Sequence, residues 1–426
     1  MDTIFALASA RGKAGVAVIR VSGDLALAAG QALCGDLPPP RRAALREVRL
    51  EGRLVDQALV LVFEPGASFT GEATVELQVH GGTASVRAVL QALAAQPGLR
   101  LAEPGEFSRR ALENGRMDLT QIEGLADLID AETEAQRRQA VAVMSGHLGQ
   151  RAERWRADLV RASALLAAVI DFSDEDVPEE VSEEVVALLD LIEGGISREL
   201  EGAGAAERIR EGFEVAIVGA PNVGKSTLLN ALAGREAAIT SDVAGTTRDV
   251  IEVRMEIDGL AVTLLDTAGL RDADDRVERI GIERGLDRAR LADLRIFLKD
   301  GAEVLPLDPA PEDIVVQAKA DLHPEREGSV SGKTGAGLDG LLLRIGAVLA
   351  GRVSGSSLVI RERHRQALSE AAGSVGSARA VIAGGGPVEL AAAELQASAR
   401  ALEIMIGKVG VEDLLDEVFS RFCIGK

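Results

Sequence analysis

The 426-residue sequence has few of the side chains that cross-link a protein or bind structural metals. Its only cysteines are Cys34 and Cys423, and its four histidines, at positions 80, 147, 323 and 364, show no zinc-ligand spacing. These absences exclude a disulfide framework and a structural zinc site. No apolar run reaches membrane-spanning length, and the N-terminus MDTIFALASARGK lacks the features of a secretory signal. We therefore expect a cytoplasmic protein.

Basic residues are also scarce relative to acidic ones. The chain has 47 lysines and arginines against 67 aspartates and glutamates, a net charge of −20. Such a chain does not coat nucleic acid through bulk charge, so any nucleic-acid contact must be local. We expect the densest basic run to form a solvated helix face paired with Glu134 and Glu153, with contact to nucleic acid as the alternative. This run comprises Arg137, Arg138, Arg151, Arg154, Arg156 and Arg161.

The length predicts about three domains, and a hydrophobic content of 47% supplies the cores. The first, residues 1–117, alternates short apolar runs with turn residues. The pattern predicts strands at 15–23, 58–63 and 74–82 and helices at 85–95 and 105–113, which together make an α+β domain.

From Thr120 the pattern becomes helical, with Thr120 and Glu123 placed as a capping-box pair. Helices are predicted to about residue 170, over 182–201, and again from 358 to the end with a glycine-rich break at 384–386. Strands and helices alternate between 213 and 351. Because each helical region is too amphipathic to be stable alone, we predict one helical domain in two parts, 118–209 and 354–426, interrupted by a nucleotide-binding domain at 210–353. Four consecutive domains are the alternative.

The octapeptide GAPNVGKS, residues 219–226, follows an apolar strand at 215–218 and precedes a helix predicted to begin at Thr227. In this context a glycine-rich loop directs backbone N–H groups and the positive end of the helix at phosphate oxygens. Lys225 can then reach the β- and γ-phosphates, and the Ser226 hydroxyl can hold Mg²⁺. The sequence therefore predicts a phosphate-binding loop.

Further motifs follow in the order that a GTPase requires. The strand at 262–265 ends in DTAG, where Asp266 can support Mg²⁺ and the amide of Gly269 can meet the γ-phosphate. Upstream, Thr247 in GTTRD is a second hydroxyl for Mg²⁺ on a loop that the γ-phosphate can order. In AKAD, residues 318–321, the two oxygens of Asp321 match the paired N–H donors of guanine, and SGK at 331–333 closes over the base.

Two positions depart from the usual GTPase pattern. Ala318 stands where asparagine would hydrogen-bond the other side of guanine, and Leu270 stands where many small GTPases have a water-orienting glutamine. Asn222 lies in the phosphate loop, where its side-chain oxygen could hold a monovalent cation against the phosphates. Glu278 follows in an acidic stretch. It is either a solvated surface charge or a catalytic group, and the residues alone leave both roles open.

Together these residues resemble the bacterial tRNA-modification GTPase family MnmE, also called TrmE. The similarity covers essentially the whole chain and is carried by DTIFALASARGKAGVAVIRVSG, SFTGEATVELQVHGG, EPGEFSRRALENGRMDLTQIEGLADLIDAET, AAVIDFSDED, GREAAITSDVAGTTRDV, DTAGLRDADDRVERIGIER and the terminal FCIGK. The resemblance implies a homodimer with an N-terminal tetrahydrofolate-binding domain and a helical domain that carries an inserted Ras-like GTPase.

The resemblance also implies function. With the flavoprotein MnmG, in a heterotetramer-type complex, such a potassium-stimulated GTPase modifies carbon 5 of the wobble uridine in certain tRNAs, giving aminomethyl or carboxymethylaminomethyl groups. The one-carbon unit comes from 5-formyl- or 5,10-methylene-tetrahydrofolate. The folate positions of the family fall on Arg20, Glu76, Arg116 and Lys426, with Arg116 in place of the frequent lysine. Cys423 is implicated in the modification reaction, and a small packed residue is the alternative reading.

By the same resemblance, Ser226 and Thr247 hold Mg²⁺, Glu278 assists the attacking water, and Lys225 and Thr247 take part in catalysis. K⁺ is bound by Asn222 and Thr246 with the carbonyls of Ser241 and Val243. The full nucleotide site comprises Gly219, Asn222, Val223, Gly224, Lys225, Ser226, Thr227, Ser241, Asp242, Val243, Ala244, Gly245, Thr246, Thr247, Asp266, Thr267, Ala268, Gly269, Ala318, Lys319, Asp321, Ser331, Gly332 and Lys333.

Two other functions share the phosphate-loop motif. A ribosome-assembly GTPase is one, although no segment resembles a KH domain and the flanking sequence is acidic. A nucleotide-binding scaffold with weak turnover is the other, and it is favoured by Ala318 and Leu270.

Overall fold

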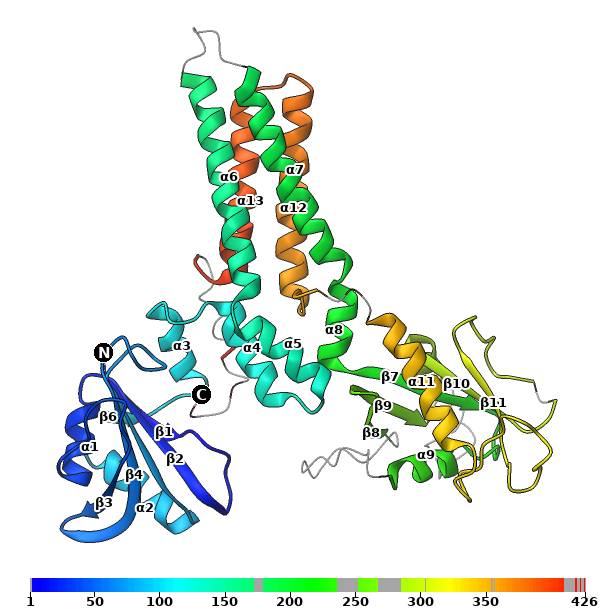
Figure 1. Ribbon diagram of the computed structural model, residues 1–426, viewed down its shortest axis with the longest axis horizontal. Coiled ribbons are helices and arrows are strands. Elements are labelled where there is room, and N and C mark those ends of the chain that lie inside the picture. The colour runs from blue at the N-terminus through cyan, green and yellow to red at the C-terminus, as the bar shows by residue number, and fades with distance from the viewer. Residues whose placement is uncertain are drawn as a thin grey trace, which may run out of the picture. The chain divides into compact units, whose positions relative to one another are not determined.

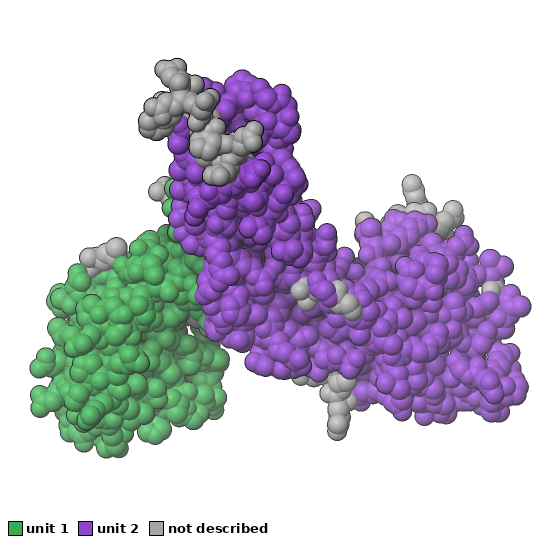
Figure 2. All heavy atoms as spheres, turned by 45° about the horizontal axis from the view of Figure 1, so that its top comes forward, with its two compact units in different colours: residues 1–126, 403–426 green, residues 127–402 purple. Residues whose placement is uncertain are grey.

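A computed structural model describes residues 2–171, 179–235, 252–266, 285–302, 304–353, 355, 357–409, 418–419, 422 and 425. The chain divides into two compact units (Figure 1; Figure 2). Unit 1 is Met1–Ala126 together with Glu403–Lys426, and unit 2 is Asp127–Leu402. Each unit is built around its own β-sheet, as the mixture of strand and helix patterns predicts.

Unit 1 holds a six-stranded sheet in the order β3-β4-β5-β2-β1-β6, antiparallel except for the parallel pair β1 and β6. Its strands are β1 (Thr3–Leu7), β2 (Ala14–Ser22), β3 (Ala44–Leu50), β4 (Arg53–Phe63), β5 (Thr74–Gly81) and β6 (Leu99–Leu101). Its helices are α1 (Ala26–Cys34), α2 (Thr83–Ala94) and α3 (Glu106–Glu113). The strands and helices predicted for this region are confirmed, with ends displaced by a few residues.

Side-chain alternation gives the sheet of unit 1 two different faces. Ile19 and Val21 of β2 and Leu77 of β5 are fully buried and pack with α1 and α2 in one core. Since successive strand residues point to opposite faces, Arg20 and Glu76 lie on the other face. A charged pair is thereby placed on a sheet whose reverse side is apolar.

The helix that follows, α4 (Leu119–Asp130), begins with a capping box that differs from the predicted one. The carboxylate of Asp118 accepts a hydrogen bond from the backbone N–H of Gln121 at 2.9 Å, and the Gln121 side chain accepts one from the Asp118 N–H at 3.0 Å. Thr120 and Glu123 are instead buried within the helix. The predicted pair was wrong because Asp118 supplies a capping oxygen two residues earlier.

The other helices outside residues 213–352 are α5 (Glu134–Met144), α6 (His147–Asp171), α7 (Glu179–Glu201), α8 (Ala203–Glu211), α12 (Glu362–Ala383) and α13 (Val388–Ile406). α7 packs against both α6 and α12 (Figure 1), and Ser398 of α13 donates to the carbonyl of Ala371 in α12. Helices from before and after residues 213–352 therefore pack against one another. Among the described helices, none combines the length and apolar character needed to cross a bilayer.

The second sheet has the order β11-β10-β7-β9-β8, with only β8 and β9 antiparallel. Its elements are β7 (Phe213–Gly219), α9 (Lys225–Ala233), β8 (Glu252–Ile257), β9 (Leu260–Asp266), β10 (Leu294–Lys299), β11 (Ile314–Gln317) and α11 (Leu338–Arg352). β7 is buried on both faces, with Val215 and Ile217 in one core and Ala216 and Val218 in another. Because β7, β9, β10 and β11 are parallel, their carboxyl ends meet at one edge of the sheet, where ligands of α/β proteins bind.

Candidate functional site

The loop after β7 has the backbone of a phosphate-binding loop. A Cβ on Gly219 would lie 2.4 Å from the carbonyl oxygen of Leu298, so only glycine fits there. Gly224 has a φ of +113° immediately before α9, and Asn222 has a φ of +62°, both in the left-handed region. Val223 is buried in the core and holds the loop against the sheet. The loop's shape is fixed by its glycines and one apolar anchor.

An ammonium, a hydroxyl and a carboxylate converge beside this loop. Lys225, the first residue of α9, is 5% exposed, and its Nζ donates to the carbonyls of Gly219 and Ala220 at 2.9 Å each. Burial lowers the pKa of Lys225, and the nearby Asp266 acts in the opposite direction. Ser226 Oγ donates to Asp266 Oδ2 at 2.6 Å. Oxygen donors of this kind suit Mg²⁺, and the ammonium suits phosphate.

The predicted base-binding residues gather at the same edge. Ala318 follows β11 with its methyl group buried, and Asp321 accepts a hydrogen bond from Ser331 Oγ at 2.7 Å, which lowers the pKa of Asp321. A Cβ on Gly332 would lie 2.6 Å from the backbone carbonyl of Thr227 in α9. The segment that contains Gly332 and the exposed Lys333 therefore packs directly on the helix that begins the phosphate site.

Sequence reasoning missed Asp300, which directly follows β10. Its carboxylate pairs with Lys319 Nζ at 2.7 Å and with Arg326 at 3.1 Å. The backbone of Lys319 has a φ of +59°, which is a sparsely populated conformation. The ion pair with Asp300 therefore involves a residue whose backbone is in the left-handed region. An acidic residue at the carboxyl end of a buried parallel strand is the signal that would have found it.

Several predicted site residues lie outside the described residues, so the structure does not test them. They are Ser241, Asp242, Val243, Ala244, Gly245, Thr246, Thr247, Thr267, Ala268, Gly269, Leu270, Glu278, Cys423 and Lys426.

In unit 1 the predicted folate residues Arg20 and Glu76 form a direct pair. They face each other across β2 and β5, and Arg20 Nε donates to Glu76 Oε1 at 2.9 Å. Their side chains are 19% and 18% exposed. The Arg20 guanidinium carbon also lies 5.2 Å and 5.5 Å from the ring centres of Phe69 and Phe107. The pair is thus a partly buried hydrogen-bonding surface bordered by aromatic rings.

Arg116 and the end of the chain reach the same unit. A Cβ on Gly71, whose φ is +81°, would lie 3.2 Å from Arg116 Cγ, so the loop before β5 packs on the stem of this arginine. Gly425 lies against the backbone of Leu7 in β1, where its Cβ would be 2.0 Å from the carbonyl oxygen. Leu7 neighbours Ala6, the register partner of Arg20.

The predicted salt bridges of the arginine-rich run are confirmed, but the run is divided between α5 and α6 and is not one helix face. Glu134 pairs with Arg137 at 2.7 Å and Arg138 at 2.9 Å in α5, and Glu153 pairs with Arg156 at 2.6 Å in α6. Arg151 and Arg161 of α6 pair with Glu199 and Glu184 of α7. The run is largely neutralised within the protein.

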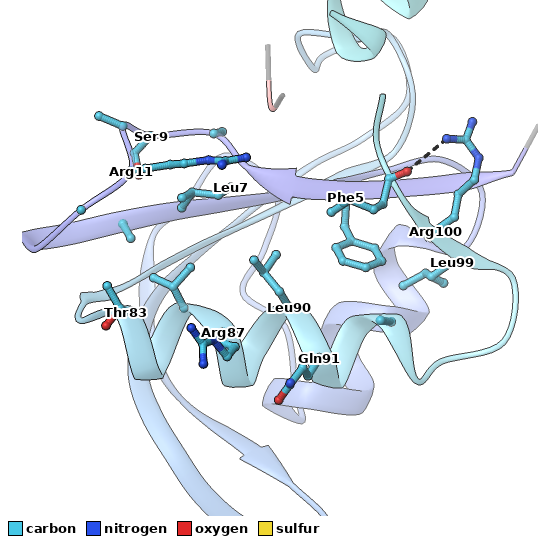
Figure 3. A pocket seen from close by; sticks show the side chains of 17 residues that line it. Phe5, Leu7, Ser9, Arg11, Thr83, Arg87, Leu90, Gln91, Leu99 and Arg100 are labelled. Carbon is cyan, nitrogen blue, oxygen red and sulfur yellow. Dashed lines mark hydrogen bonds between the residues drawn. The ribbon is translucent and has the colours of Figure 1, made fainter. Parts of the chain in front are cut away.

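A cavity of about 920 Å³ in unit 1 lies on the opposite side of the sheet from the Arg20–Glu76 pair. Leu90 of α2 and Phe5 of β1 line its apolar part, while Arg11 belongs to the segment between β1 and β2 (Figure 3). None of the predicted site residues in the described part of the chain lines it. The sheet therefore separates this cavity from the Arg20–Glu76 pair.

Comparisons with known proteins agree across the chain. The family model "GTP-binding protein TrmE N-terminus" matches residues 3–116, and "MnmE helical domain" matches residues 119–423. The tRNA modification GTPase MnmE of Cereibacter sphaeroides is 60% identical over 100% of both chains. The protein of the same name from Roseobacter denitrificans is 55% identical, also over 100% of both chains. A crystal structure of Aquifex aeolicus Era bound to GDP·AlF4⁻ is 29% identical over 32% of this chain and 56% of that chain, with a TM-score of only 0.23.

Proposed function

The chain belongs to the MnmE family of tRNA modification GTPases, and we propose a distinct role for each of its two units. It is an enzyme that binds GTP and acts in tRNA modification. We propose that it acts in the cytoplasm with the flavoprotein MnmG on carbon 5 of the wobble uridine, giving aminomethyl or carboxymethylaminomethyl groups. The observation that carries the GTPase part is the convergence of Lys225, Ser226 and Asp266 beside the loop after β7.

In the proposed mechanism the triphosphate lies along the loop 219–227. Backbone amides and the ammonium of Lys225 hold its phosphate oxygens, and the carboxylate of Asp321 accepts the two N–H donors of guanine. Ser226 and Thr247 would hold Mg²⁺, which neutralises charge on the phosphates when bound. Glu278 would orient the attacking water from a distance. The hydrogen bond between Ser226 and Asp266 supports this assignment, because it places a hydroxyl and a carboxylate together at the phosphate end.

A potassium ion is proposed to supply the positive charge that an arginine finger provides elsewhere. Its ligands would be Asn222, Thr246 and the carbonyls of Ser241 and Val243. Asn222 suits this role because it is exposed within the loop, has a left-handed backbone and precedes the buried Val223. Because Leu270 occupies the glutamine position, stabilisation of transition-state charge by a cation would contribute more to the rate of hydrolysis. Binding of K⁺ would also draw two G domains of a homodimer together.

We expect Asn222→Ala to abolish the potassium stimulation of GTP hydrolysis while leaving GTP affinity within about threefold, since the side chain contacts the cation and not the base. Phosphate release in KCl and in NaCl measures this. Asn230→Ala, at an exposed position of α9, the helix that follows the loop, is the matched control. Potassium stimulation that persists in Asn222→Ala would show that Asn222 is not a K⁺ ligand. Hydrolysis in neither salt by the unaltered protein would instead favour a nucleotide-binding scaffold.

Unit 1 is proposed to bind the one-carbon carrier, 5-formyl- or 5,10-methylene-tetrahydrofolate, through Arg20, Glu76, Arg116 and Lys426. A carboxylate such as Glu76 can accept paired N–H groups of the pterin, and the cationic side chains suit the carrier's glutamate carboxylates. Cys423 is proposed to take part in the modification chemistry. We also propose the division into 1–117, 118–209 with 354–426, and 210–353 as the N-terminal, helical and G domains.

We expect Glu76→Gln to weaken binding of 5-formyl-tetrahydrofolate by about tenfold or more, because an amide can accept only one of two paired N–H donors and leaves Arg20 without its anionic partner. Isothermal titration with the folate measures the change. Glu47→Gln, an exposed site of the same sheet, should bind normally. Equal affinities for both variants would exclude Glu76 from the site.

The proposed biological reaction is tested in cells that lack this protein. Nucleoside analysis of their tRNA should show wobble uridines without the carbon-5 group, restored by the intact gene. Fully modified uridines in the deleted strain would refute the reaction. Preferential retention of purified protein on ribosomal subunits over isolated tRNA would point to a ribosome-assembly GTPase.

A further inference from the structure

The loop of residues 64–73, between β4 and β5, borders the residues proposed for the one-carbon carrier, and a role for this loop rests on that proposed site. Phe69 of this loop places its ring 5.2 Å from the Arg20 guanidinium carbon. Gly71 packs on the stem of Arg116, and β5, which begins directly after the loop, carries Glu76. The position of this loop therefore sets the surroundings of all three side chains.

A buried polar network fastens the loop to the sheet. Ser22 lies two residues beyond Arg20 on the same face of β2, and its hydroxyl donates to Glu72 Oε2 at 2.7 Å. Ser22 Oγ also lies 2.6 Å from Thr70 Oγ1, and Ser68 donates to the backbone carbonyl of Glu72 at 2.6 Å. Ser22, Ser68 and Thr70 are each less than 5% exposed. The polar groups of the loop are thus satisfied in one particular arrangement.

Arg110 of α3 secures this arrangement from the other side. Its side chain is 5% exposed, and its guanidinium donates to Glu72 Oε1 at 3.0 Å, to Glu106 at 2.9 Å and to the Asp2 carboxylate at 2.9 Å. A buried cation is tolerated only where anionic acceptors surround it, and movement of the loop would remove one of the three carboxylates that surround this charge. Phe107, three residues earlier on α3, packs beside Arg20. The short helix α3 therefore contacts both Glu72 of the loop and Arg20 of the candidate site.

We infer that Glu72 and Arg110 form a positioning pair for the one-carbon carrier site. They fix the 64–73 loop, and through Phe69 and Gly71 the loop fixes the guanidinium of Arg20 and the stem of Arg116. Neither Glu72 nor Arg110 touches the carrier. Their contribution is to hold the charged and aromatic groups of the site in one geometry before the carrier binds, which reduces the ordering that binding must impose.

The test is a double-mutant cycle on the full-length protein, with 5-formyl-tetrahydrofolate as the probe in isothermal titration. Glu72→Gln keeps the shape of the side chain and removes its charge, and Phe69→Leu removes the ring over Arg20. We expect each change alone to weaken binding about tenfold. Because both act through one loop, the double variant should lose about tenfold as well, rather than about a hundredfold. A general loss of stability would give multiplicative losses, which would overturn the inference.

Asp313→Asn is the matched control, since it neutralises a similarly buried carboxylate paired with Arg295 in unit 2. It should leave folate affinity unchanged. If Glu72→Gln does not fold, Ser22→Ala replaces it, with an expected loss of about threefold from one hydrogen bond, and unchanged affinity there would overturn the inference. If the unaltered protein binds no folate, the proposed carrier site itself falls. If it binds folate and Glu72→Gln binds equally well, only the positioning pair falls.

Discussion

Replacing Lys225 with methionine should lower GTP hydrolysis on the order of 10²–10³-fold, the cost of removing one preorganised cationic donor from a water-excluded site. Methionine keeps the apolar stem, so the buried position, only 5% exposed, stays filled. What disappears is the ammonium that now bonds the carbonyls of Gly219 and Ala220 and that we propose bonds the phosphates. Single-turnover phosphate release and titration with a non-hydrolysable GTP analogue measure the two contributions.

Lys13→Met, which removes an exposed ammonium from unit 1, is the control and should hydrolyse GTP normally. The loop itself should persist in Lys225→Met, because its shape depends on Gly219, Gly224 and the buried Val223. A normal melting temperature with lost hydrolysis is the expected combination. Unchanged hydrolysis would show that the phosphates bind elsewhere.

Replacing Asp321 with asparagine should change the preferred base from guanine to xanthine. Xanthine has a carbonyl where guanine has its exocyclic amine, and an asparagine amide offers one acceptor and one donor to match it. The hydrogen bond from Ser331 lowers the pKa of Asp321, so the native residue is a carboxylate that only accepts at neutral pH. Ala318 has no polar group to add to the recognition. Selectivity for guanine over other bases therefore depends on Asp321. In Asp321→Asn we expect GTP affinity to fall on the order of 10²–10³-fold as XTP affinity rises.

Competition titrations with GTP and XTP test this exchange. Asp308→Asn, at an exposed position of the same unit, should keep the native preference for GTP. A variant Asp321→Asn that still prefers GTP would place the base away from residues 318–321, and the assignment of Ser331, Gly332 and Lys333 would fall with it.

The fold and the phosphate site were largely predictable because their signals are local. Glycine at 219 and 224 and lysine at 225 act within one loop, and the apolar run of β7 needs no partner to be recognised. The start of α4 was predicted wrongly, because two overlapping capping patterns stand two residues apart there. Helix propensity does not distinguish the pair Asp118 and Gln121 from the pair Thr120 and Glu123. In the folded unit Thr120 and Glu123 are buried, and Asp118 and Gln121 form the capping box.

The class of chemistry can be predicted from local motifs, since a phosphate-binding loop, a DxxG motif and a guanine-type aspartate each depend on residues adjacent in the chain. Which distant side chains meet is known only from the folded chain. Arg20 and Glu76 pair because β2 and β5 share one register, and Arg110 reaches Glu72 because α3 packs on the face of the sheet that carries them. Strand register and helix docking depend on long-range burial, which joins residues tens of positions apart and leaves no mark in the spacing of either segment.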